Sequence, residues 1–192
     1  MRRLIIADDE PVIRKDLRKI LEEHGFLIVG EASDGFDAIE ICRNNKPDLV
    51  LMDVNMPFLD GINAAGLIMN ENLASSVVLI SEKSDTETIN RAKEAGVMGY
   101  LVKPIDKVML LTSIEIAIAN GEKIKKIKHE YDEMKENLDN RKIIEKAKGI
   151  MMKKYGMDEN EAYSHIRKLS MDKRCTMKQI ASTILLNHRA AL

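Results

Sequence analysis

The first hundred residues contain five short runs of apolar side chains, which begin at Leu4, Phe26, Leu49, Val77 and Tyr100. Between these runs the apolar residues recur every three or four positions, which is the spacing of an amphipathic helix. The helical segments are 12–24, 35–44, 61–70 and 86–95, and a fifth is predicted to begin near Asp106. Short, uniformly apolar runs that alternate with helices are typical of a parallel sheet covered on both faces.

The fifth helix is predicted to dock on the sheet through Val108, Leu111, Ile114 and Ile118. Farther along, alternating spacings of three and four give the a and d pattern of a coiled coil. Its positions are Ala117, Asn120, Ile124, Ile127, Tyr131, Met134 and Leu138. About three heptads is the lower limit for this pattern, so a single helix packed on its own domain stays an alternative. Gly121 is a candidate break or kink.

No strand-like run follows residue 120, and three further helical segments are predicted at 141–155, 159–172 and 176–186. Gly156 fits the end of a helix. Asp158 fits an amino-terminal cap paired with Glu161, and Thr176 begins the last helix in the same way. We therefore predict a domain over residues 1–120, a helical linker or coiled coil over 121–140, and a three-helix domain over 141–192.

Charge divides the chain into two parts of opposite sign, although the formal net charge of the whole sequence is only −1. Residues 1–120 hold 13 basic and 20 acidic side chains, a net of −7, whereas residues 121–192 hold 17 and 11, a net of +6. Cys42 and Cys175 have no CxxC spacing or histidine partner pattern, which argues against a disulfide framework and a zinc site. The first apolar run is too short for a signal peptide or a membrane span, so we expect a cytoplasmic protein without membrane contact.

Acidic residues follow two of the predicted strands. Asp8 and Asp9 come after the first strand, and Asp53 comes after the third. A lone aspartate after a strand is more often a helix cap or a turn residue. Neighbouring parallel strands end at one edge of a sheet, however, so three carboxylates are expected to converge and to repel one another. A magnesium ion removes this repulsion and pairs with phosphate oxygens, so the cluster predicts a site for Mg²⁺ and a phosphoryl group.

Two more side chains supply what phosphoryl transfer to Asp53 requires. Ser81 places a hydroxyl at the end of the fourth strand, and Lys103 places an ammonium at the end of the fifth. With a metal ion, these groups can neutralise the oxygens of a phosphoryl group in transit. An aspartate carboxylate is an established nucleophile for this reaction.

Together these motifs resemble the receiver domain of two-component response regulators, over residues 1 to about 120. The matching pieces are Asp8 and Asp9, Asp53 within MDVNMP, Ser81, and Lys103 with Pro104. The resemblance implies a flavodoxin-like, doubly wound α/β fold with a five-stranded parallel sheet in the order 2-1-3-4-5. It also implies a sensor histidine kinase as the partner that supplies the phosphoryl group.

The same resemblance assigns roles to single residues. Asp9, Asp53 and the backbone carbonyl of Asn55 are expected to bind Mg²⁺ directly, with Asp8 acting through water. Ser81 and Tyr100 match the switch pair that responds to phosphorylation, and Lys103 is expected to contact the phosphate through a loop with a cis Lys103–Pro104 bond. The chain is then no enzyme with an external substrate, although it is expected to catalyse its own phosphotransfer and dephosphorylation.

The basic segment from Arg141 to about Leu186 resembles the ANTAR domain, a three-helix RNA-binding module of transcription antiterminators. The resemblance rests on AKGIMM, on EAY followed by IRKLSM, and on MKQIA. The predicted core stripe is Ile143, Ile144, Ala147, Ile150 and Met151. A glycine inside a helix costs about 0.5–1 kcal/mol against alanine, so Gly149 indicates close approach of either another helix or a ligand backbone.

Residues 141–192 hold 12 basic and 5 acidic side chains, and the net of +7 is a footprint suited to a phosphate backbone. The basic residues outside the stripe are the candidate RNA contacts, although such a run is also common on a purely solvated face. They are Arg141, Lys142, Lys146, Lys148, Lys153, Lys154, Arg167, Lys168, Lys173, Arg174 and Lys178. The groups available to stack on unpaired bases are Tyr155, Tyr163, His165 and Arg167.

These features predict a response regulator that dimerises when phosphorylated and binds tandem RNA hairpin loops in a leader transcript, which promotes antitermination. Ethanolamine-utilisation regulators share this arrangement of domains. A different class of function remains open, in which the helical tail of a phosphorylation-gated dimer binds a protein partner and its basic face only confers solubility. DNA binding is a third possibility, but no recognition-helix pattern stands out.

Overall fold

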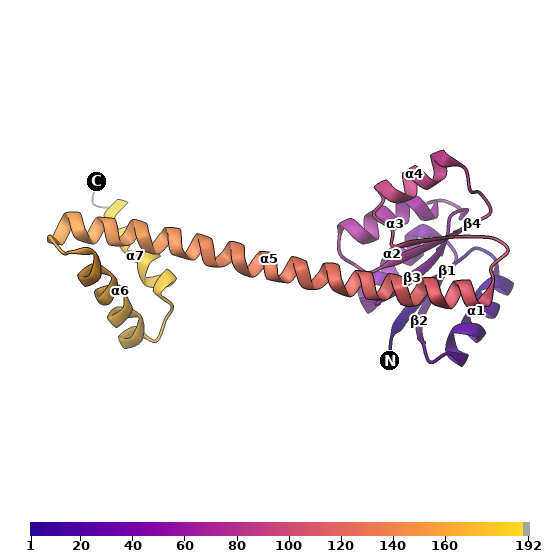
Figure 1. Cartoon of the computed structure of the whole chain (residues 1–192), viewed down its shortest axis with the longest axis horizontal. Helices are drawn as coiled ribbons and strands as arrows, with labels where there is room; N and C mark the ends of the chain where they lie inside the picture. Colours follow the sequence, from indigo (N-terminus) through magenta and orange to yellow (C-terminus); the bar gives the residue numbers. More distant parts are fainter. Residues whose placement is uncertain (190–192) are drawn as a thin grey trace. The chain divides into compact units, whose positions relative to one another are not determined.

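The computed structural model describes residues 1–189, and its first part is built on one sheet of five parallel strands (Figure 1). The strands follow the order β2-β1-β3-β4-β5, which confirms the predicted flavodoxin-like fold. Their bounds are β1 Arg3–Ala7, β2 Leu27–Ala32, β3 Leu49–Asp53, β4 Val77–Ser81 and β5 Gly99–Val102. Each predicted apolar run therefore begins within one residue of the start of a strand.

Helices cover both faces of this sheet, as Figure 1 shows. Alternate side chains of each strand point to opposite faces, so Leu4 and Ile6 pack with α1 and α5, whereas Ile5 and Ala7 pack with α2, α3 and α4. Burial on both faces explains why the central strands β1, β3 and β4 carry consecutive apolar residues rather than one at every second position. The helices are α1 Pro11–Glu23, α2 Gly35–Asn45, α3 Gly61–Asn70, α4 Thr86–Glu94 and α5 Lys107–Tyr155.

Three of the four residues predicted to dock α5 on the sheet do so, since Ile114 and Ile118 are buried and Leu111 packs against the same core. Leu110, Ile114, Ala117 and Ile118 are buried against the sheet, whereas Val108 is 69% exposed. The Asp106 carboxylate accepts hydrogen bonds from the backbone N–H groups of Val108 and Met109, so these residues form the capped first turn. The expectation that Val108 docks on the sheet is therefore wrong, and Leu110 takes that place.

Helix α5 is continuous over 49 residues, so it includes both the predicted linker and the predicted first helix of the basic domain. Gly121 does not interrupt it. A Cβ atom at Gly121 would lie 2.2 Å from Ser76 Oγ and 2.5 Å from the Ser75 carbonyl oxygen. Gly121 thus allows α5 to pass close to the loop before β4, and close packing rather than helix breaking explains this residue.

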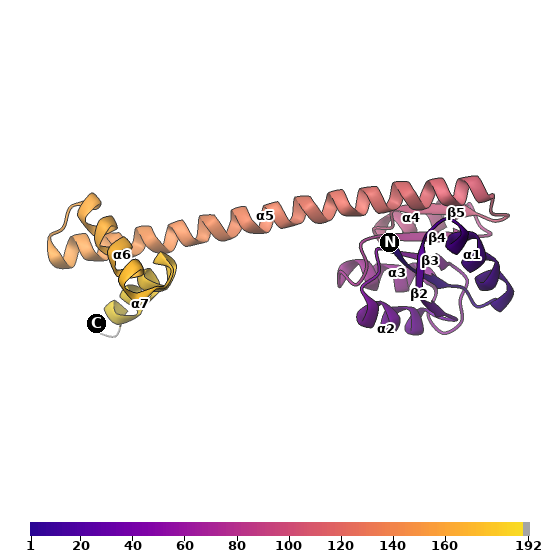
Figure 2. The same ribbon diagram turned by 90° about the horizontal axis from the view of Figure 1, so that it is seen from below.

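The chain divides into two compact units, of which the first is Met1–Lys126 and the second begins at Ile127. In the second unit, α6 Glu159–Lys173 and α7 Met177–Arg189 lie against the last turns of α5 in both views (Figure 1, Figure 2). The predicted core residues Ile143 and Ile144 pack against their small shared core. Its buried residues include Ala147, Met151, Ala162, Ile166 and Ala181. Among residues 1–189, no helix combines the length and the apolar character that crossing a membrane requires.

The ends of these helices follow the predicted signals. Gly156 has a φ of +67° just after α5, a backbone conformation that favours glycine. Asp158 and Glu161 form a complete capping box at the start of α6. At the start of α7, Thr176 Oγ1 accepts a hydrogen bond from the backbone N–H of Gln179, whose side chain accepts one from the backbone N–H of Thr176. All three predicted helix boundaries are confirmed.

Candidate functional sites

Three charged side chains from three strand ends meet at one edge of the sheet. Asp53 is the last residue of β3, Asp8 directly follows the neighbouring strand β1, and Lys103 directly follows β5. Both aspartates are buried, with exposed fractions of 2% and 0%. The Lys103 Nζ lies 2.6 Å from Asp53 Oδ1 and 3.5 Å from Asp8 Oδ2. The structure thus brings two of the three predicted carboxylates together with the predicted ammonium, whereas Asp9 is exposed beside them.

Burial and the neighbouring charges have opposite effects on the pKa values of Lys103 and Asp8. Burial alone would lower the pKa of the Lys103 ammonium, but its pairing with Asp53 and Asp8 outweighs that effect and raises the pKa. Burial raises the pKa of the Asp8 carboxyl, although the backbone N–H of Glu10 and the Lys103 charge both oppose the rise. Within residues 1–189, Asp8 Oδ2 and Asp53 Oδ1 contact the Lys103 ammonium but have no hydrogen bond of good geometry. One ammonium therefore serves two buried carboxylates, which leaves the site short of positive charge.

The donor set at this edge suits a hard divalent cation. Asp53 Oδ2 accepts a hydrogen bond of 2.5 Å from the backbone N–H of Asn55, which fixes the loop after β3 beside the carboxylate. Asp9 is exposed next to buried Asp8. Within the described residues, no three His, Cys, Asp or Glu side chains already converge as a metal site. Magnesium does not require such a cage, because it keeps several waters and uses only one or two carboxylates. The residues therefore fit Mg²⁺.

Ser81 and Tyr100 are joined through the loop that follows β4. Ser81 is fully buried, and its Oγ accepts a hydrogen bond of 3.0 Å from the backbone N–H of Lys83. The Tyr100 hydroxyl donates a hydrogen bond of 2.6 Å to the carbonyl oxygen of Lys83. A displacement of the Ser81 hydroxyl would therefore disturb the segment that holds the Tyr100 ring. The Lys103–Pro104 peptide bond is cis, as the resemblance implied.

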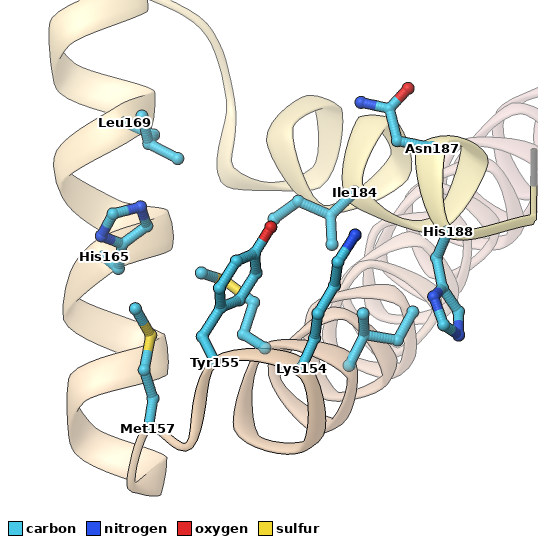
Figure 3. A pocket seen from close by; sticks show the side chains of 10 residues that line it. Lys154, Tyr155, Met157, His165, Leu169, Ile184, Asn187 and His188 are labelled. Atoms are coloured by element: carbon cyan, nitrogen blue, oxygen red, sulfur yellow. The ribbon is translucent and has the colours of Figure 1, made fainter. Parts of the chain in front are cut away.

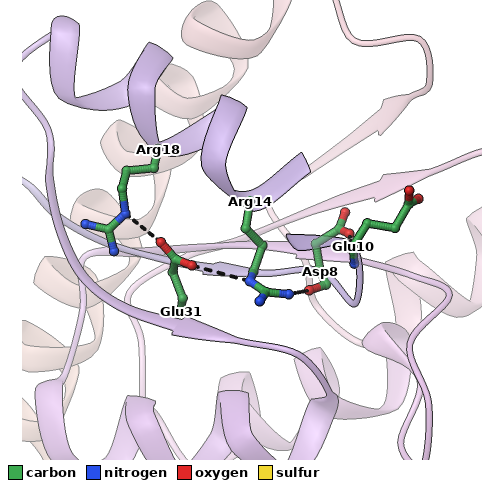
Figure 4. Close-up of polar contacts among 5 residues, drawn as sticks. All are labelled: Asp8, Glu10, Arg14, Arg18 and Glu31. Carbon is green, nitrogen blue, oxygen red and sulfur yellow. Dashed lines mark hydrogen bonds and ion pairs between the residues drawn. The ribbon is translucent and has the colours of Figure 1, made fainter. Parts of the chain in front are cut away.

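A polar network that the sequence did not reveal holds the loop carrying Asp8 (Figure 4). Arg14 Nη1 donates a hydrogen bond of 2.6 Å to the backbone carbonyl of Asp8. Glu31 on β2 accepts hydrogen bonds from Arg14 and Arg18 of α1, at 3.3 Å and 2.5 Å. These residues come from three different elements and form no motif, so only the fold shows that α1 and β2 together position the loop.

Most of the predicted RNA-binding residues lie on the surface of the second unit. Lys178 is half-buried and lies 3.5 Å from Glu136, and Lys142 lies 3.6 Å from Asp139. Lys142 is exposed, and so are eight further candidates, which are Arg141, Lys146, Lys153, Lys154, Arg167, Lys168, Lys173 and Arg174. These side chains are accessible to a large ligand.

Lys148 differs from this group because its side chain is only 7% exposed. Its Nζ lies 2.9 Å from Glu145 and 2.8 Å from Glu159, so the ammonium links α5 to the start of α6. The hydrogen bonds to Glu159 and Glu145 raise the pKa of the Lys148 ammonium. The structure thus gives Lys148 a role inside the domain, and the expectation that it contacts RNA is not retained.

Comparison with known proteins establishes the family. The model of the response regulator receiver domain matches residues 4–115, so the chain belongs to the response regulators. A second model, the ANTAR domain, matches residues 132–185, and the chain is therefore a response regulator with an ANTAR output domain. It is 44% identical over 184 residues to the transcriptional regulatory protein PdtaR of Mycobacterium tuberculosis strain H37Rv, a match that covers 96% of this chain and 89% of that protein.

Solved structures give the same result for the first unit. The receiver domain of the response regulator NarL from Mycobacterium tuberculosis superposes with a TM-score of 0.59 at 28% identity, covering 62% of this chain and 96% of that one. A chain of the CheX–CheY–BeF3–Mg complex from Borrelia burgdorferi superposes with a TM-score of 0.55 at 28% identity, covering 59% and 86%. Receiver domains generally bind Mg²⁺ at the site of phosphorylation.

Proposed function

We propose that this response regulator accepts a phosphoryl group on Asp53 from a sensor histidine kinase and, as a phosphorylated dimer, binds RNA hairpin loops to promote transcription antitermination. The observation that carries the proposal is the Lys103 Nζ at 2.6 Å from Asp53 and 3.5 Å from Asp8, in a chain that also has an ANTAR domain. We assign these activities to residues 1–120 and 141–192, with 121–140 as the helical linker, and place the protein in the cytoplasm.

At the phosphorylation site, Asp53 supplies the nucleophilic oxygen. Asp9, Asp53 and the Asn55 carbonyl are assigned to Mg²⁺, with Asp8 acting through water. The metal ion, when bound, offsets the charge of the carboxylates and of the phosphoryl oxygens. The Lys103 ammonium is already placed beside Asp53, so it can follow the negative charge from the carboxylate to the new phosphoryl oxygens. The Ser81 hydroxyl is assigned to a third phosphoryl oxygen, and Tyr100 responds through the Lys83 carbonyl.

An exposed apolar stripe on α5 supports dimerisation by the linker. Its residues are Ile124, Ile127, Tyr131, Met134 and Leu138, and each is between 51% and 63% exposed. They follow the alternating three- and four-residue spacing of a coiled-coil seam. A helix with such a stripe gains free energy when a second copy covers it. A dimer brings two ANTAR domains to one RNA, and linking two weak sites raises the apparent affinity without new contacts.

Polar substitutions in the stripe should prevent the dimer. We expect the double variant Ile127→Gln and Met134→Gln to remain monomeric after treatment with acetyl phosphate and Mg²⁺, whereas the wild type becomes a dimer by light scattering. Glutamine keeps the helix propensity high, so the helical signal should not change. The matched control places the same two glutamines at His129 and Glu133, on the opposite side of α5. If Ile127→Gln with Met134→Gln forms a dimer as stable as that of the wild type, the apolar stripe of α5 is not the dimer interface.

The basic surface of the second unit supports RNA as the ligand. The assigned contacts are Arg141, Lys142, Lys146, Lys153, Lys154, Arg167, Lys168, Lys173, Arg174 and Lys178. RNA loops are read through unpaired bases, while lysine and arginine neutralise the phosphates and release counterions. The name of the relative PdtaR describes a transcriptional regulatory protein, which agrees with an output at the level of transcription.

RNA binding is tested with the leader transcript upstream of the neighbouring gene and with the same transcript carrying scrambled loops. We expect the phosphorylated chain to prefer the native loops, and the affinity to fall steeply as salt rises because several phosphates are neutralised. If both transcripts bind with equal affinity, a tail that binds a protein partner is favoured instead. The same holds if the affinity falls with salt no more steeply than a few phosphate contacts require.

A further inference from the structure

The second unit contains a hollow between the end of α5, α6 and α7, shown in Figure 3. Its volume is about 370 Å³, which is within the range of about 300–1,000 Å³ that small-ligand pockets occupy. Apolar side chains line much of it, among them Met151, Met157, Leu169 and Ile184. Ile150, predicted as part of the core stripe, also lines the hollow and is only half-buried. The domain therefore offers a partly apolar cavity open to solvent.

Polar and aromatic groups surround this cavity. Figure 3 shows the Tyr155 ring between α6 and α7, with His165 on one side and Lys154 on the other. Tyr155 is 60% exposed, and the Lys154 Nζ lies 5.7 Å from the centroid of its ring. His188 and Asn187 of α7 also line the cavity. An accessible ring beside hydrogen-bonding groups is the combination that stacks on a flat heterocycle and contacts its edge.

A second, shallower hollow of about 670 Å³ adjoins the first and shares Ile150, Lys154 and His188 with it. Lys146 and Lys153 also line it, so three lysines border the same depression. Among the described residues that line the two hollows, none is acidic. The charge therefore suits an anionic chain that runs past the mouth of the cavity.

Gly149 forms part of this second hollow, in the interior of α5. Among residues 1–189, no atom would lie within 4 Å of a Cβ atom at this position, whereas a Cβ atom at Gly121 would collide with the loop before β4. Helix packing therefore explains Gly121 and does not explain Gly149. Glycine weakens a helix interior, so its presence in an open position favours the close approach of a ligand, which was the second of the two interpretations that the sequence allowed.

We propose that the first hollow receives one unpaired RNA base, which stacks on Tyr155, while its sugar and phosphates pass over Gly149 between Lys146 and Lys153. His165, Asn187 and His188 supply the polar groups that contact the edge of the base. This assignment rests on the proposed RNA-binding function and specifies where a loop nucleotide is read. It also separates the stacking candidates, since Tyr155 and His165 line the cavity whereas Tyr163 and Arg167 do not.

The test uses the full chain, phosphorylated with acetyl phosphate, and an RNA hairpin selected by that chain from a pool with a fixed stem and a randomised loop. Each loop nucleotide of the selected RNA is then replaced by an abasic ribose. With the wild type, we expect one abasic position to weaken binding about tenfold, the size expected from loss of one stacked base. In the Tyr155→Leu variant the intact RNA should bind about tenfold more weakly, and the same abasic change should cost less than about twofold.

Matched variants separate the pocket from general damage to the fold. Gly149→Gln fills the second hollow and favours the helix, so it should lower RNA affinity about tenfold while the unfolding temperature stays equal or rises. Ser164→Gln on the exposed surface of α6 and Tyr163→Leu outside both hollows should bind as the wild type does. Helical content is measured for every variant by circular dichroism.

The outcomes distinguish this proposal from the function on which it rests. If the wild type prefers its selected loop but Tyr155→Leu and Gly149→Gln bind it equally well, the pocket assignment is wrong and RNA binding stands. An abasic loss that is the same in the wild type and in Tyr155→Leu also rejects the pocket. If the wild type enriches no loop from the pool, both the pocket and the proposed function fail.

Discussion

The variant Asp53→Asn is expected to incorporate no acid-labile phosphate from acetyl phosphate in the presence of Mg²⁺, whereas the wild type incorporates up to one group per chain. An amide lacks the negative charge that attacks phosphorus and that binds the metal ion. Asparagine has nearly the same shape, so the fold should persist. Labelling is measured by mobility on a phosphate-affinity gel, before and after brief acid treatment.

The control for this experiment is Asp37→Asn, which removes an exposed carboxylate from the first turn of α2. It should be labelled to the same extent as the wild type. Undiminished labelling of Asp53→Asn would move the phosphoryl acceptor to another residue. The interpretation of Lys103 and Asp8 as parts of the same site would then also lose its basis.

The variant Gly61→Ala is expected to destabilise the first unit strongly. Gly61 begins α3, and a Cβ atom there would lie 1.9 Å from the carbonyl oxygen of Asp53 and 2.9 Å from its carbon. Backbone atoms cannot rotate away as a flexible side chain can, so α3 or the end of β3 must move. Forced overpacking of this kind costs about 1–3 kcal/mol and occasionally more. The free energy of unfolding is measured by urea titration.

Gly66→Ala in the same helix is the matched control. The nearest atom to its new Cβ would be the Ala95 Cβ at 3.7 Å, an ordinary contact, so the substitution should stabilise the helix by up to about 1 kcal/mol. Because Gly61 touches the backbone of Asp53, Gly61→Ala should also slow phosphorylation, and Gly66→Ala should not. Equal stability of the two variants would show that α3 does not need the close approach at Gly61.

The sequence predicted the strand-end cluster because parallel strands deliver their last residues to one edge. Asp8, Asp53 and Lys103 each follow an apolar run, and the structure places the three together. The depth of the site could not be predicted, since the exposure of Asp9 beside buried Asp8 depends on how the loop turns. The link from Arg14 to the Asp8 carbonyl joins different elements and has no sequence signal.

In the helices, the sequence does not determine which side chains face the core and which face solvent. Val108 lies in the turn capped by Asp106 and is exposed, whereas Leu110 is buried against the sheet. Lys148 resembles its basic neighbours in the sequence, yet two carboxylates draw it into the domain. Gly121 and Gly149 are both glycines inside a helix, so the sequence does not distinguish them. The surrounding described atoms show that Gly121 is closely packed and that Gly149 is open.

We propose that phosphorylation of Asp53 controls RNA binding by the second unit. The measurement that decides this is the dissociation constant of the full chain for a transcript with two hairpin loops, determined by fluorescence anisotropy at fixed salt with and without acetyl phosphate. Phosphorylation should tighten binding by about a hundredfold or more, as expected when two linked domains act together, and Asp53→Asn should show no response. A dissociation constant that does not change on phosphorylation of the wild type would show that Asp53 does not control RNA binding.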